Sequence, residues 1–198
     1  HQYSLWDGNW LNWNASGGSV TKQRSEIVKE VANQLLDNID GVNVGLMRFH
    51  REEGGPVLQA IEDIGTSRAA MKTAIDSLPA SGYTPLSETL YEAGQYYAGR
   101  NVDYGNVEEP RSVAASRLGN DITSNTYRAP VNAACQKNYI VLLSDGAPTR
   151  DVSAQSKIES LPGFSTLVGP SCDGGTGDGV CLDDMAEYLH KYDLDSTL

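Results

Sequence analysis

Apolar residues in the first third of the chain follow helical and strand-like patterns in turn. Ile27, Val31 and Leu35 are spaced four apart, which predicts an amphipathic helix whose apolar face lies against a sheet. The stretch TSRAAMKTAIDSL repeats this helical spacing further along. Two helices should therefore cover a sheet in this part of the molecule.

Three apolar runs have the character of strands. GVNVGLMRF and GGPVLQAIEDI follow each other after a short connection, so we expect them to pair as antiparallel neighbours. The third run, YIVLLSD at residues 139–145, is apolar along nearly its whole length. Such a run is typical of a strand that is buried on both faces, as in a parallel sheet.

Two further helices are expected after residue 80. In GYTPLSETLYEAGQYYAG, Thr84 is a candidate N-cap and Pro85 takes the first helical position. The buried stripe of this helix would consist of Leu86, Leu90, Ala93 and Tyr97. The last helix is expected in LDDMAEYLHKYDL, with Leu182, Met185, Ala186 and Leu189 facing inward.

Strands that alternate with amphipathic helices predict an α/β layered fold built on a mostly parallel sheet. We expect one domain over residues 1–198, with polar, turn-rich insertions at about 100–135 and 147–180. Ligands of such folds collect at the carboxyl ends of the strands. Thr84 and Asp145 would both lie there.

The charge of the chain limits the classes of binding partner that we expect, and its cysteines bear on the redox state of its cellular compartment. The net charge of −11 makes nucleic acid and anionic membrane surfaces poor partners, and no apolar run is long enough to span a membrane. Cys172 and Cys181 bracket a glycine-rich loop that a disulfide can close, which would imply an oxidising compartment. Free thiols are the alternative, and Cys135 has no evident partner.

The hydroxyl of Thr84 and the carboxylate of Asp145 have the chemistry of a magnesium site. Mg²⁺ takes oxygen ligands and keeps several waters, so two such groups on neighbouring loops suit it. Taken singly, each residue also has an ordinary structural role, because threonine before proline caps helices and Asp-Gly after a strand forms turns.

Four segments resemble a known family. GVNVGLMRF, GYTPLSETLYEAGQYY, CQKNYIVLLSDGAPT and CLDDMAEYL are similar to the von Willebrand factor A domain of PilY-type adhesins, which are associated with the tip of the type IV pilus. The resemblance covers nearly the whole chain. It implies a doubly wound sheet and a metal-ion-dependent adhesion site, whose second and third loops would carry Thr84 and Asp145.

The resemblance implies a function without bond breaking. The expected role is adhesion and type IV pilus biogenesis at the pilus tip, outside the bacterial cell, through a divalent metal that accepts a carboxylate from the partner. The expected partners are minor pilins and a host or surface ligand, and the domain would belong to a longer chain with a β-propeller. The metal would be Mg²⁺, or else Mn²⁺ or Ca²⁺.

The chain departs from the family in its first metal loop. The only candidate for its D-x-S-x-S motif is NASGGS, in which Asn14 stands for the aspartate and Gly18 for the second serine. No apolar strand precedes NASGGS, so we interpret it as a flexible linker that enters the following helix. On this interpretation the chain lacks the first and last strands of the family's sheet. The hypothesis is that residues outside these 198 complete the site, and a metal is expected only in that case.

Two alternatives remain. The chain can be a von Willebrand A domain of another secreted binding protein. It can also be a phosphatase of the haloacid dehalogenase type, which uses a strand ending in Asp-Gly. That enzyme has a second carboxylate two residues away from the first, whereas the residue two before Asp145 is Leu143. We therefore expect no enzymatic activity.

Overall fold

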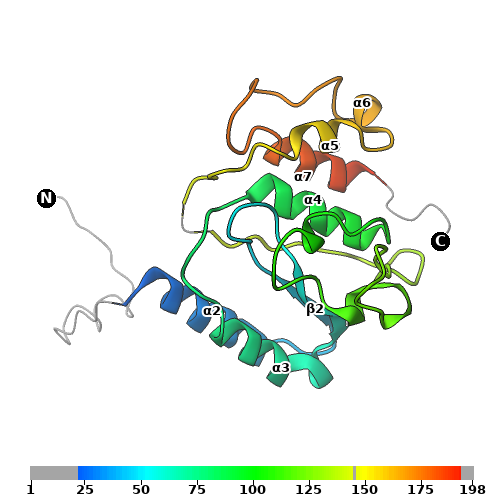
Figure 1. Ribbon diagram of the computed structural model, residues 1–198. Helices are drawn as coiled ribbons and strands as arrows, with labels where there is room; N and C mark the ends of the chain where they lie inside the picture. Colours follow the sequence, from blue (N-terminus) through cyan, green and yellow to red (C-terminus); the bar gives the residue numbers. More distant parts are fainter. Residues whose placement is uncertain (1–21, 145, 193–198) are drawn as a thin grey trace, which may run out of the picture.

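The computed structural model describes residues 22–144 and 146–192, and its helices and strands are arranged in layers (Figure 1). The order along the chain is α2 (Arg24–Asn38), β1 (Asn43–Met47), β2 (Val57–Asp63), α3 (Ile64–Asp76), α4 (Leu86–Tyr97), α5 (Gln155–Glu159), α6 (Phe164–Leu167) and α7 (Leu182–Lys191). Three short 3-10 turns, η1 (Tyr104–Asn106), η2 (Ala114–Ser116) and η3 (Leu118–Asn120), lie between α4 and α5.

The expected antiparallel pair of strands is confirmed. β1 and β2 pair with Asn43 opposite Asp63 and Met47 opposite Val57, with irregular register between these ends. Glycine is needed at position 45, because a Cβ there would lie 2.7 Å from the side chain of Ile61 on the opposite strand. The hairpin is thus closely packed across its two strands.

The expected doubly wound, mostly parallel sheet is wrong. The described part of the chain contains one sheet, and it has two antiparallel strands. The run at 139–145 was predicted to be a strand buried on both faces. Its described residues, 139–144, form no strand, and their side chains are exposed, with Tyr139 at 75% and Val141 at 73%. The physical reason is that a strand needs a hydrogen-bonded neighbour, and none of the described segments pairs with this one.

The helix α2 forms as expected but turns a different face inward. Its stripe of Ile27, Val31 and Leu35 is exposed at 47%, 53% and 50%, whereas Leu36 is buried. Polar bonds to α3 fix this orientation. The bonds are those of Lys29 Nζ to the Asp76 carbonyl, Asn33 Nδ2 to Asp76 Oδ1, and Lys72 Nζ to Asp37.

Among the described residues, two of the three apolar clusters join helices to one another, and the third joins β2 to α4 through Val57 and Tyr96. Beneath the hairpin, Leu36 of α2 packs with Ile64, Met71 and Ile75 of α3. On the other side, α4 is buried from Leu86 to Tyr96, and the α5–α7 layer covers it (Figure 1). The second cluster joins α4 to that layer through Leu90, Tyr91, Tyr104, Ile158, Phe164, Met185 and Tyr188, together with both half-cystines of a disulfide. Among the helices of the described residues, none is long and apolar enough to cross a membrane.

Candidate functional site

Thr84 lies where two loops meet before the start of α4. Its backbone N–H and C=O bond to the C=O and N–H of Thr149, at 3.3 and 3.1 Å, and its N–H also reaches Thr149 Oγ1 at 3.0 Å. The Thr84 side chain is half-buried, and its hydroxyl has no hydrogen-bond partner among the described residues. This pair of backbone bonds, the Thr84–Thr149 bridge, holds Thr84 next to the loop that follows residue 145.

Asp151, and not Thr84, caps α4. The helix begins at Leu86, and Asp151 accepts bonds from the Ser87 N–H and hydroxyl, both at 2.8 Å, and from the Glu88 N–H at 3.1 Å. A carboxylate is well placed there, because the first N–H groups of a helix have no partner within it and carry partial positive charge. The predicted Thr84 cap is thus wrong.

The loop that follows the α5–α6 pair holds Asp151 in turn. The Asp151 N–H donates to Asp178 Oδ1 at 2.6 Å, and the Gly179 N–H donates to the Asp151 carbonyl at 3.1 Å. This loop is closed by the disulfide between Cys172 and Cys181, the pairing that the sequence suggested. Cys135 is an exposed free thiol.

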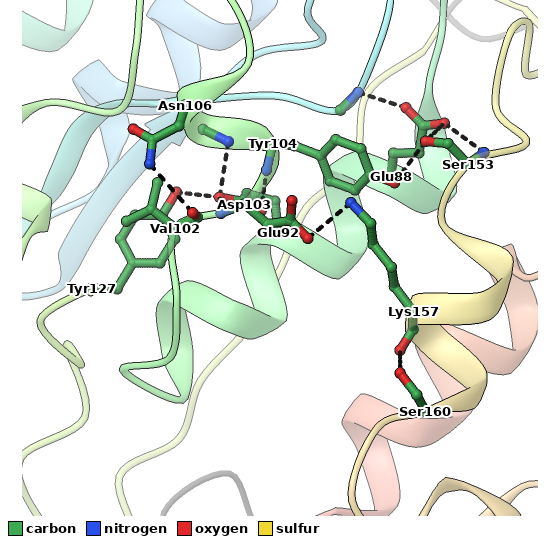
Figure 2. A network of polar contacts seen from close by, with 12 residues as sticks. Glu88, Glu92, Val102, Asp103, Tyr104, Asn106, Tyr127, Ser153, Lys157 and Ser160 are labelled. Atoms are coloured by element: carbon green, nitrogen blue, oxygen red, sulfur yellow. Dashed lines mark hydrogen bonds and ion pairs between the residues drawn. The ribbon is translucent and has the colours of Figure 1, made fainter. Parts of the chain in front are cut away.

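Glu88 is a buried carboxylate that joins α4 to two further segments (Figure 2). It accepts the Gly54 N–H at 2.7 Å, and the Ser153 N–H and hydroxyl at 3.0 and 2.9 Å. Burial raises the pKa of Glu88 above its ordinary value and the nearby Asp151 carboxylate adds to the rise, while the donors from Ser153 and Gly54 oppose it.

Glu92, one turn further along α4, does the same for the segment after the helix (Figure 2). It accepts the N–H groups of Asp103, Tyr104 and Gly105 at 3.0 to 3.1 Å and the Tyr127 hydroxyl at 2.6 Å. Burial raises the pKa of Glu92, and these four donors act in the opposite direction. The carboxylate is fully enclosed by the groups that it orders.

Lys157 of α5 closes the network at its outer side (Figure 2). Its Nζ lies 2.9 Å from Asp103 Oδ2 and 3.9 Å from the centre of the Tyr104 ring. The Tyr104 hydroxyl is 2.7 Å from Ser153 Oγ, which links it back to Glu88. A cation over an aromatic face is attracted to the ring electrons.

The chemistry available to this network is structural. Each of the three buried carboxylates accepts backbone N–H groups with both of its oxygens, so none is poised to take a proton from a substrate. The network joins the segments around residues 54, 104 and 153 to a single buried helix. It supports the helix that begins two residues after Thr84.

The predicted metal pair can be placed only in part. Asp145 and the NASGGS segment lie outside the described residues. Thr84 fits the role of a hydroxyl ligand, since it is half-buried and its hydroxyl has no hydrogen-bond partner among residues 22–144 and 146–192. Over residues 22–144 and 146–192, no three histidine, cysteine or acidic side chains come together in a way that could hold a metal ion.

The roles of Glu88, Glu92 and Asp151 were not predicted from the sequence. A signal for the first two was present. In LSETLYEAGQYY, Glu88 and Glu92 are the only charged residues, so the helix has no solvated charged face and its carboxylates must find partners inside. Asp151 had no comparable signal, because its role depends on a contact 64 residues away in sequence.

No protein-family model matches this chain, and no significant match is found among curated proteins or among solved structures. The likeness to the von Willebrand A family therefore depends on the four segments quoted above.

Proposed function

We propose that this chain is a non-enzymatic adhesion module that binds a protein or surface partner at the tip of a type IV pilus, outside the cell. The observation that carries the proposal is the pair of loops joined by Thr84 and Thr149, in which the Thr84 hydroxyl has no hydrogen-bond partner among the described residues. The resemblance of the segments around Thr84 and Asp145 to a pilus-tip adhesin supports this choice of setting.

The support beneath these loops favours binding over catalysis. Recognition residues are commonly found on loops that a rigid scaffold positions. Here Asp151 joins one loop to the first turn of α4, and the Thr84–Thr149 bridge joins the other loop to it. The buried carboxylates serve the backbone, which suits a surface that recognises a partner without changing it.

A divalent metal would be held by Thr84 and Asp145, together with ligands from residues outside these 198. Bound there, the ion would supply an open position for a carboxylate of the partner. The contribution of this chain is to fix the Thr84 hydroxyl, which the bridge to Thr149 does through its backbone.

The metal part of the proposal is tested by titrating Mn²⁺, observed by electron paramagnetic resonance, into the natural polypeptide that contains these residues. Thr84→Ala and Asp145→Asn should each weaken Mn²⁺ binding at least tenfold. Thr166→Ala, at an exposed threonine of α6, is the matched control and should bind as the parent does. Equal binding in all four proteins, or no binding in the parent, would show that these residues hold no metal.

The adhesion part is tested separately with immobilised minor pilins as the probe. Binding should be measurable by biolayer interferometry and should fall in the Thr84→Ala protein and with a chelator present. Absence of binding would overturn the pilus assignment, whatever the outcome of the Mn²⁺ titration.

A further inference from the structure

The loop that the disulfide closes, residues 172–181, packs directly on the loop that contains Pro148 and Asp151. The contact is close at Gly179, where φ is 74° and a Cβ would lie 2.4 Å from Pro148 Cγ. The Gly179 N–H donates to the Asp151 carbonyl at 3.1 Å, and Asp178 Oδ1 accepts the Asp151 N–H at 2.6 Å. The disulfide loop therefore holds its neighbour by packing and by two hydrogen bonds.

The disulfide loop has little structure of its own. None of its residues belongs to a helix or a strand, and four of its ten residues are glycine. A glycine-rich segment has more backbone freedom to regain than any other when a restraint is removed. The bridge between Cys172 and Cys181 restrains both ends, with the Cα atoms 5.3 Å apart. The positions of Asp178 and Gly179 therefore depend on this covalent closure.

The loop that receives these contacts also carries the candidate binding surface. Thr149 forms the bridge to Thr84, and Asp151, two residues later, caps α4. The backbone that the disulfide loop holds at Asp151 is thus continuous with the backbone that pairs with Thr84. A shift of the disulfide loop away from Asp151 would loosen the Thr84–Thr149 bridge as well.

The two half-cystines are shielded from solvent. Cys172 is 5% exposed and Cys181 is 2% exposed, and both lie in the cluster that joins α4 to the α5–α7 layer. Exchange between a thiol and a disulfide requires access to a sulfur atom. Once formed, the bridge is therefore protected from reductants in the folded protein, which suits a bond that is made once and then kept.

We propose that oxidation of Cys172 and Cys181 is the step that locks the Thr84–Thr149 bridge, so that the candidate binding surface is complete only in an oxidising compartment. The two thiols lose two protons and two electrons as the S–S bond forms, and a disulfide oxidant takes up both and becomes a dithiol. In the dithiol form, Asp178 and Gly179 release Asp151, and the bridge opens more often.

Hydrogen exchange followed by NMR tests the lock without any ligand. In the oxidised protein, the N–H groups of Thr149 and Asp151 are bonded to Thr84 and Asp178. After reduction with dithiothreitol they should exchange roughly tenfold faster or more, and reoxidation should restore the slow rates. The N–H groups of β2 report any general loss of stability. Equal rates in both forms, or a rise no larger than in β2, would overturn the proposal.

Replacement of both half-cystines by alanine gives the open form without a reduction step. In this double variant the N–H groups of Thr149 and Asp151 should exchange as fast as in the reduced protein. Slow exchange of both groups in the folded double variant would show that the bridge is locked without the disulfide, and would overturn the proposal.

Two glycines of the loop provide a matched test in which the disulfide stays intact. Gly179→Ala places a methyl group against Pro148, whereas a Cβ at Gly174 would meet nothing within 4 Å. Both glycines have positive φ, at 74° and 93°, so both variants carry a similar backbone strain. Exchange of the Thr149 N–H should be faster in Gly179→Ala only. Equal rates in the two variants would mean that contact with Pro148 does not hold the bridge.

Binding to immobilised minor pilins separates this inference from the proposed function, on which its role in regulation rests. The oxidised protein should bind, and the dithiol form should bind roughly tenfold more weakly or less. Equal binding by both forms would overturn control by oxidation and leave the adhesion function standing. Faster exchange in the dithiol form, with pilin binding in neither form, would overturn the adhesion function and leave the lock standing.

Discussion

At the scale of single residues, Asp151 has the widest influence on the structure. Its carboxylate satisfies two N–H groups and a hydroxyl at the first turn of α4, while its own backbone bonds to the disulfide-closed loop. One side chain therefore determines how the helix begins, and the same residue fixes where the loop of Cys172 and Cys181 lies. Because the site is buried, water cannot replace these bonds if they are lost.

Replacement of Asp151 by alanine should lower the free energy of unfolding by about 2 to 3 kcal/mol, since it removes a helix cap and leaves buried donors unpaired. Urea unfolding followed by circular dichroism measures this change. Asp121→Ala is the control, because Asp121 makes two similar bonds to Thr123 on an exposed loop. A loss there of more than about 0.5 kcal/mol, or no loss at Asp151, would contradict the assigned role.

At the scale of elements, local patterns predicted the structures that local contacts make. The helices at α3, α4 and α7 and the β1–β2 pair were correct, because their periodicity and short connection are properties of neighbouring residues. The YIVLLSD strand was wrong, because a strand depends on partners that periodicity does not reveal. The same holds for the residues of the candidate site. Thr84 was identified from its neighbour Pro85, whereas Asp151 acts through a contact that is distant in sequence and was not predicted.

The helix α2 shows how polar contacts can decide which of two apolar faces is buried. Its residues Ala32 and Leu36 pack on the α3 cluster, while the stripe of Ile27, Val31 and Leu35 faces solvent. The bonds from Lys29 and Asn33 to Asp76 lie along the seam between α2 and α3. Apolar spacing alone therefore predicted the helix correctly and its rotation incorrectly.

Two adjacent leucines of α2 provide a matched test of this rotation. Leu36 is 4% exposed and Leu35 is 50% exposed. Leu36→Ala should cost about 2 to 4 kcal/mol of unfolding free energy, because it leaves a cavity in the cluster, and Leu35→Ala should cost less than about 1 kcal/mol. Thermal and urea unfolding measure both variants. Equal losses, or a larger loss at Leu35, would mean that the helix is rotated relative to this description.

At the scale of the whole molecule, α4 is the element to which the layers attach. The hairpin segment attaches through Gly54 to Glu88, the segment after α4 through Tyr104 to Glu92, and the α5–α7 layer through Ser153 and Asp151. The disulfide lies in the cluster that joins this outer layer to α4. Loss of the disulfide should therefore destabilise the entire α5–α7 layer.

Replacement of both Cys172 and Cys181 by alanine should lower the free energy of unfolding by about 3 kcal/mol, because the unfolded chain regains the freedom of a loop of about ten residues. Chemical denaturation with and without reductant measures this change. Cys135→Ala is the control, at an exposed thiol, and should stay within about 0.5 kcal/mol of the parent. A double variant as stable as the parent would contradict a structural role for the bridge.

The same bridge also changes how the molecule responds to tension. Its half-cystines are nine positions apart along the chain but their Cα atoms are separated by 5.3 Å. Fully stretched, nine residues would span about 30 Å, so the bridge withholds roughly 25 Å of contour length from a chain that is pulled from its two ends. Force transmitted through the outer layer passes across the bridge and bypasses residues 173–180. Asp178 and Gly179, which hold Asp151, are therefore outside the path of a pulling force for as long as the bridge remains oxidised.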